Sequence, residues 1–136
     1  MRTTADTSVI VASFASWHEN HAAAVAAIAR VDLILTHCLI ETYSVLTRLP
    51  APHRVDAETV ATYLRLAFGS HAVAGLTAGE QRKLIETCAH SRIVGSAIYD
   101  AMIAAAAVRA KAKLLTLDTR ARGAYAALGA QHELVI

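Results

Sequence analysis

ADTSVIVA, residues 5–12, places an aspartate directly before a run of apolar residues near the start of the chain. Three of the four residues in Ser8–Val11 are β-branched, and such a run predicts a buried strand. A carboxylate beside a buried strand is costly unless it is paired or binds a metal ion. Asp6 is therefore expected to have a partner elsewhere in the chain.

Strand-like and helix-like segments alternate from this stretch to the end of the chain. Asp56 can cap one helix, and Thr77 with Glu80 fits a capping box at the start of another. The expected strands are 8–11, 33–35, 71–76, 113–117 and 133–136, and the expected helices are 17–30, 39–46, 57–68, one opened by Thr77, 97–112 and 120–128. This alternation predicts an α/β fold with a mostly parallel central sheet flanked by helices.

Length and composition predict one globular domain. The 136 residues lie within the usual size of a domain, about 100 to 150 residues, and are enough to bury a core. No repeat or linker divides the chain, so a single domain over residues 1–136 is expected. Hydrophobic residues make up 55% and charged residues 18%, which excludes disorder and favours contact of some apolar surface with a partner.

Charge and hydropathy exclude several classes of protein. The formal net charge of +2 is too small for a protein that grips a long duplex through its phosphates alone. Charged residues interrupt every apolar stretch before the roughly 18 to 20 residues that a membrane-spanning helix needs. Asp6 falls where the apolar part of a signal peptide would begin, and Cys38 and Cys88 lack metal-ligand spacing. We therefore expect a cytoplasmic protein with reduced, buried thiols.

Four of the eleven acidic residues stand in unusual places: Asp6, Glu41, Asp100 and Asp118. Each alone is compatible with a surface charge, a helix cap or an ion pair with Arg48, Arg92 or Arg120. In parallel sheets, however, side chains beyond the carboxyl ends of the strands converge on one ligand site. Carboxylates gathered there without matching cations suit a divalent metal ion, since Mg²⁺ prefers oxygen ligands. From the residues alone, both interpretations stay open.

Four stretches carry a resemblance to a known family. They are ADTSVIVA around Asp6, LIETYSVLTRLP around Glu41, GSAIYDAMIAAAA around Asp100 and LLTLDTRA around Asp118. In order and spacing, along nearly the whole chain, they resemble the motifs of PIN-domain nucleases. The small size most resembles the VapC toxins of bacterial type II toxin-antitoxin pairs.

The resemblance implies a Mg²⁺-dependent endoribonuclease, with Mn²⁺ as a possible substitute, that hydrolyses RNA phosphodiester bonds through a metal-activated water. It assigns the acidic pocket to Asp6, Glu41, Asp100 and Asp118, with Asp6 and Asp100 as metal ligands and Thr7, Ser8 and Thr116 as supporting hydroxyls. Many relatives carry another acid shortly after the last motif. Here Thr119 and Arg120 follow Asp118, so the number of metal ions stays open.

The resemblance also implies partners: an RNA substrate, a VapB-like antitoxin and a second copy of the chain in a homodimer. The candidates for contacts with the RNA backbone are Arg48, Arg120 and Arg122, although a solvated face explains each equally well. The candidates for an apolar groove that holds the antitoxin tail are Tyr43, Leu46, Tyr63, Leu64 and Phe68, with core packing as the alternative.

Two other functions fit parts of the pattern. A phosphoacceptor signalling domain also uses acids at strand ends, but it needs an aspartate after the central strand, and residues 72–76 contain none. A catalytically silent PIN-like binding module would not need all four acids. Trp17 and Tyr99 could stack on bases, although lone aromatic residues near apolar ones usually belong to a core.

Overall fold

Five short parallel strands form the centre of the protein, for which a computed structural model describes residues 1–136. Strands β1 (Arg2–Ala5), β4 (Ala112–Thr116) and β5 (His132–Leu134) pair in the order β1-β4-β5, and β2 (Leu33–Leu35) pairs with β3 (Ala72–Ala74). The two sheets meet where the Asp32 N–H donates to the Thr3 carbonyl at 2.8 Å, next to β2. Every strand pairing is parallel, which confirms the predicted α/β class.

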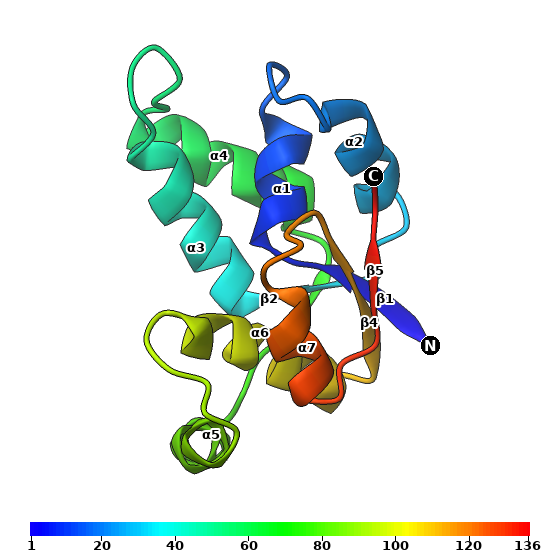
Figure 1. Ribbon diagram of the computed structural model, residues 1–136. Helices are drawn as coiled ribbons and strands as arrows, with labels where there is room; N and C mark the ends of the chain where they lie inside the picture. The colour runs from blue at the N-terminus through cyan, green and yellow to red at the C-terminus, as the bar shows by residue number, and fades with distance from the viewer.

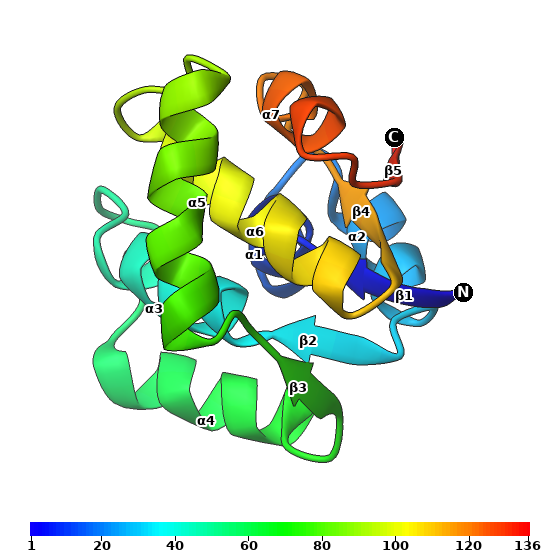
Figure 2. The ribbon, with the colours of Figure 1, turned by 90° about the horizontal axis from the view of Figure 1, so that it is seen from below.

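Seven helices surround these strands. They are α1 (Thr7–Phe14), α2 (His21–Ile28), α3 (Thr36–Thr47), α4 (Ala57–Phe68), α5 (Ala78–His90), α6 (Ala97–Arg109) and α7 (Arg122–Ala127). In Figure 1, α1 and α2 lie above the strands, and α5, α6 and α7 lie below them. Seen from below in Figure 2, α5 lies beside the start of α6 and runs across its direction, while α4 lies beside β3 at the far edge. None of the helices has the length and hydropathy needed to cross a membrane.

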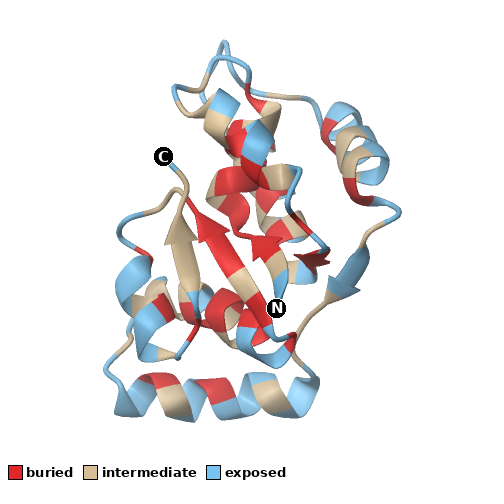
Figure 3. Ribbon diagram, turned by 90° about the vertical axis from the view of Figure 1, so that its right-hand side faces the viewer, coloured by how far each residue is buried: buried red, intermediate tan, exposed pale blue.

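The core lies between the strands and the two helix layers. Figure 3 shows the central strands almost continuously buried. Leu33, Ile34 and Leu35 of β2, and Leu114 and Leu115 of β4, are fully buried, and each contributes roughly 1.5–3 kcal/mol through removal of its side chain from water. Helix α6 faces this core mainly with alanines, whose small side chains let the helix lie close to the strands.

The predicted strand over Ser8–Val11 is wrong. Those residues lie in α1, and the strand is the preceding segment Arg2–Ala5. The Asp6 carboxylate caps the helix by accepting the Val9 N–H at 3.3 Å, so the chain turns from strand to helix at this residue. A short apolar run fits a buried helix as well as a buried strand. As a consequence, Asp6 stands at the carboxyl end of β1.

The other predicted elements are present, with shifted ends. Helix α4 begins after the cap at Asp56, and the capping box at the start of α5 is formed. Helix α6 ends three residues earlier than expected because Lys111 has a positive φ of 54° and the chain enters β4 at Ala112. Helix α2 begins only at His21. The predicted free, buried thiols of Cys38 and Cys88 are confirmed.

Loss of the capping box should destabilise the protein measurably. Thr77→Ala removes the hydroxyl that accepts the Glu80 N–H at 3.1 Å, and we expect the free energy of unfolding to fall by about 1 kcal/mol. Urea denaturation followed by circular dichroism measures the change. Thr77→Ser, which keeps the acceptor, should match the wild-type protein. Equal loss in both variants would mean that the methyl group, not the cap, is what matters.

Candidate active site

The four predicted acids come together at one edge of the sheet. Asp6 follows β1, Asp118 follows β4 by two residues, Glu41 lies on α3, and Asp100 lies in the first turn of α6. A groove of about 960 Å³ is lined by Glu41, Asp100 and Asp118. Asp6 is only 2% exposed, and its neighbours Thr7 and Ser8 line the groove. The topology therefore joins side chains that are far apart in the sequence.

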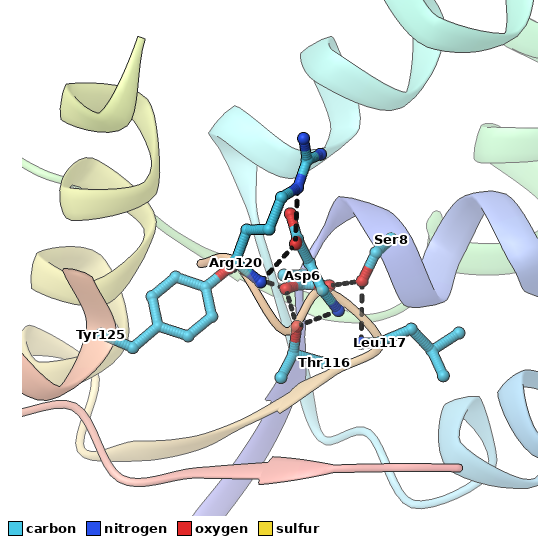
Figure 4. Close-up of polar contacts among 7 residues, drawn as sticks. Asp6, Ser8, Thr116, Leu117, Arg120 and Tyr125 are labelled. Carbon is cyan, nitrogen blue, oxygen red and sulfur yellow. Dashed lines mark hydrogen bonds and ion pairs between the residues drawn. The ribbon is translucent and has the colours of Figure 1, made fainter. Parts of the chain in front are cut away.

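Asp6 is the most strongly held of these acids. Its Oδ1 accepts the hydroxyl of Ser8 and the N–H of Val9, and its Oδ2 accepts the hydroxyls of Thr116 and Tyr125, the last at 2.7 Å. Figure 4 shows the side chains of Ser8, Thr116 and Tyr125 directed at this carboxylate. Burial raises the pKa of Asp6, and the four donors act in the opposite direction by stabilising its charge.

The same hydroxyls fix the loop that carries Asp118. Ser8 Oγ accepts the Leu117 N–H, and Thr116 Oγ1 accepts the Asp118 N–H, both at 2.9 Å. Each hydroxyl thus accepts from the loop and donates to Asp6. Asp118 cannot shift without disturbing the buried carboxylate. Ser8 and Thr116, the two hydroxyls expected to have a supporting role, thus join the buried carboxylate to the loop of Asp118.

Glu41 has its own set of contacts on α3. It accepts a hydrogen bond from the Thr7 hydroxyl, and its Oε2 lies 3.7 Å from His37 Nε2, one helical turn away. The His37 imidazole, the Thr7 hydroxyl and Arg48 hold the pKa of Glu41 below its ordinary value, although partial burial opposes them. His37 Nε2 itself is buried without a hydrogen-bond partner, because 3.7 Å is too long for one.

The Asp100 carboxylate has the fewest stabilising contacts of the four acids. Burial and the carboxylates of Asp118, Glu41 and Asp6 raise its pKa to about 6, and only Arg120 opposes them. No hydrogen bond contributes to its pKa, in contrast to Asp6 and Glu41. The negative charge in the groove is thus incompletely balanced by the chain's own residues, and Asp100 carries most of that imbalance.

The three predicted arginines are placed differently. Arg48 and Arg120 line the groove, and Arg120 Nε lies 3.7 Å from Asp118 Oδ1. At 93% exposure, the Arg120 side chain is free to reach a ligand. Arg122 is exposed at the start of α7 and does not line the groove.

Two residues that contact the acids, Tyr125 and His37, were not predicted from the sequence. Tyr125 is 1% exposed and donates its hydroxyl to Asp6, while His37 stacks in parallel on Tyr99, with ring centroids 5.9 Å apart. A lone tyrosine in the Ala-rich stretch 121–130 was the available signal for the first, since a buried tyrosine hydroxyl usually has a partner. Nothing in the sequence distinguishes His37 from the other six histidines.

The types of donor atom in the site suit a divalent cation, although the side chains are not arranged as a complete set of metal ligands. Its donors are carboxylate oxygens, and the unbalanced charge on Asp100 favours a cation there. As the side chains stand, no three His, Cys, Asp or Glu residues are grouped closely enough to hold a metal ion. One or two carboxylates completed by water are nevertheless sufficient for Mg²⁺. The residues present therefore fit such an ion.

Comparisons with known proteins agree with this geometry. The family model described as "PIN domain" matches residues 4–126. Ribonuclease VapC40 of Mycobacterium tuberculosis H37Rv is 47% identical over 130 residues, covering 96% of both chains. Ribonuclease VapC27 of the same strain is 38% identical over 125 residues, covering 91% of this chain and 90% of the relative. With the acids of all four motifs gathered at one sheet edge, the chain belongs to the PIN-domain family.

Proposed function

We propose that this protein is a divalent-metal-dependent endoribonuclease that acts as the toxin of a type II toxin-antitoxin pair in the cytoplasm. The observation that carries this is the groove in which Glu41, Asp100 and Asp118 face one another beside the buried Asp6. The family, and relatives of almost equal length that are named ribonucleases, support the same activity.

Of the two expected ligands, Asp100 would hold the metal directly, with Mg²⁺ as the expected ion and Mn²⁺ as a substitute, and Asp6 would contribute its buried negative charge. When bound, the ion supplies an activated water and neutralises charge on the phosphodiester. A carboxylate has about four acceptor positions, and those of Asp6 are filled by its four donors. Asp6 is thus the fixed anion of the site, and Asp100 is the carboxylate with free acceptor positions.

The remaining groups orient the substrate and the acids. Thr7 holds Glu41, and Ser8 and Thr116 hold Asp6 together with the loop of Asp118. Arg48 and Arg120 line the groove and can contact phosphate oxygens, which offsets the repulsion between RNA and the carboxylates. No side chain is needed as a covalent nucleophile.

We infer that the domain extends over residues 1–136, beyond the matched region. Strand β5 lies after residue 126, yet it pairs with β4 in parallel from Leu114–His132 to Thr116–Leu134. Removal of this strand would expose the edge of β4, which supplies Thr116 and leads to Asp118. The C-terminal segment is therefore part of the unit that supports the site.

We place the antitoxin in a second groove, of about 560 Å³, between α3, α4 and β3. Tyr43, Leu64 and Phe68 line it, as the sequence suggested, whereas Leu46 is fully buried in the core and Tyr63 contacts Phe14. An apolar groove beside the acidic site suits a peptide whose apolar side chains anchor it and whose basic residue reaches the carboxylates.

Exposed Ile85 and Val94 are available for the contact between two copies of the chain in a homodimer.

Replacement of the Asp100 carboxylate should abolish RNA cleavage. Asp100→Asn keeps the shape of the side chain and removes its charge, so we expect at least a hundredfold lower rate on single-stranded RNA with Mg²⁺. EDTA should reduce the wild-type protein to the same level. Asp32→Asn is the matched control, because Asp32 is exposed and contacts only the backbone near Thr3. Cleavage by Asp100→Asn at the wild-type rate contradicts the assignment.

The same substitution should stabilise the metal-free protein. Because folding raises the pKa of Asp100 from 3.8 to about 6, the ionised carboxylate disfavours the folded state above pH 6, and this penalty is absent below pH 3.8. At pH 7.5 in EDTA, Asp100→Asn should melt roughly 2–4 °C higher than the wild type, and the gain should vanish as the pH falls from 6 to 4.

Millimolar Mg²⁺ should then raise the melting temperature of the wild type at pH 7.5 by more than that of Asp100→Asn, since the variant lacks the carboxylate with free acceptor positions. Calorimetry in both buffers measures these shifts. Equal melting temperatures of the two proteins at every pH would show that the charge of Asp100 does not destabilise the folded state.

Disruption of the α3–α4 groove should separate antitoxin binding from catalysis. Leu64→Glu places a charge in the apolar groove, and we expect at least tenfold weaker binding of the co-expressed antitoxin. RNA cleavage by the purified variant should stay unchanged, because Leu64 does not line the acidic groove. Growth arrest by this variant despite co-expressed antitoxin would agree, and full rescue by the antitoxin would place the interface elsewhere.

A further inference from the structure

The acidic groove continues well beyond the carboxylates. His37, Glu41, Ser44 and Arg48 lie on one face of α3, and all four line the groove. At about 1.5 Å per residue, the helix axis between the first and the last of them is roughly 16 Å long. The groove thus has two ends: the acids at one, and Arg48 with the loop between α1 and α2 at the other.

An exposed aromatic pair stands at this second end. Residues His18, Glu19 and Asn20 of the α1–α2 loop line the groove, and the preceding residue, Trp17, is 49% exposed. Its indole ring stacks on His53 of the α3–α4 loop, with centroids 4.1 Å apart and planes inclined by 26°. Both loops lie at the top of Figure 1, near the carboxyl ends of α1 and α3.

This arrangement differs from a tryptophan in a core. Half of the largest side chain in the protein faces solvent, although burial would stabilise it. His53 fixes the orientation of the ring from one side. The ring of His18 is tilted by 38° to the indole, with centroids 6.0 Å apart, so it does not stack in parallel on Trp17.

We propose that Trp17, backed by His53, is a stacking site for an unpaired nucleobase of the RNA substrate. This inference rests on the proposed ribonuclease function. The loop that carries Trp17 lines the groove that holds the acids, so an RNA strand lying in the groove reaches the indole. Arg48, which donates to Ser44 Oγ at 3.0 Å, caps α3 at the same end of the groove as the α1–α2 loop and can contact a phosphate of that strand.

A nucleobase fits this site better than a protein side chain does. Stacking needs a flat, exposed ring beside cationic groups that follow the phosphate backbone, and both are present here. The apolar groove that suits a peptide lies elsewhere, against α4 and β3. Trp17 thus belongs to the substrate-binding surface, where it positions the strand and does not take part in bond cleavage.

The single tryptophan of the chain makes the proposal directly testable. In the Asp100→Asn background, titration with a single-stranded RNA oligonucleotide should quench the fluorescence of Trp17, and a blunt-ended RNA duplex should quench it much less. By anisotropy of a labelled RNA, Trp17→Ala should bind roughly tenfold more weakly, and Trp17→Phe should recover most of the loss. Unchanged fluorescence with saturating RNA overturns the proposal.

Cleavage assays distinguish this proposal from the function on which it rests. Trp17→Ala in the active protein should raise KM and leave kcat within about twofold, while Leu66→Ala, which removes an exposed apolar side chain on α4, should change neither. Metal-dependent cleavage with identical KM in Trp17→Ala leaves the ribonuclease function intact and refutes the stacking site. Quenching without any cleavage refutes the ribonuclease function and leaves an RNA-binding site.

Discussion

The buried Asp6 carboxylate is the contact on which the rest of the structure depends. It caps α1, accepts the hydroxyl of Thr116 at the end of β4 and accepts that of Tyr125 on α7. A charge buried at this depth is tolerated only because all its acceptor positions are filled. The same condition forces three distant segments into one arrangement. The edge of the sheet that carries the acids is thus assembled by the need to satisfy one anion.

Asp100 shows the opposite balance. Repulsion from its neighbours and partial burial raise the pKa of Asp100, and the chain provides only the distant help of Arg120. Such uncompensated charge lowers the stability of the folded protein and is typical of a functional site. Asp6 and Asp100 are therefore not equivalent members of one cluster: the first organises the fold, and the second keeps the binding capacity that the first has used internally.

Sequence reasoning could reach most of this arrangement, but not all of it. The α/β class followed from the alternation of strand-like and helix-like segments. The first residues of α4 and α5 followed from the N-caps at Asp56 and Thr77, which are local signals. The strand assigned to Ser8–Val11 was wrong because a run of four residues with three apolar ones is too short to distinguish a strand from a helix by its period. The motifs located the four acids, yet the role of Tyr125 depends on a contact across 119 residues, which no local pattern contains.

Helix α3 explains how one small domain can serve two binding partners. Glu41, Ser44 and Arg48 face the acidic groove, whereas Leu39 and Tyr43 face the apolar groove against α4 and β3. Ile40 lines both grooves, so the two surfaces meet along this helix. In the complex proposed above, a peptide on the apolar side would cross Ile40 and bring a guanidinium to the carboxylates, where it would compete with a cation for the same unbalanced charge. The charge that makes Asp100 suited to a metal ion also makes it the point at which a protein partner can block the site.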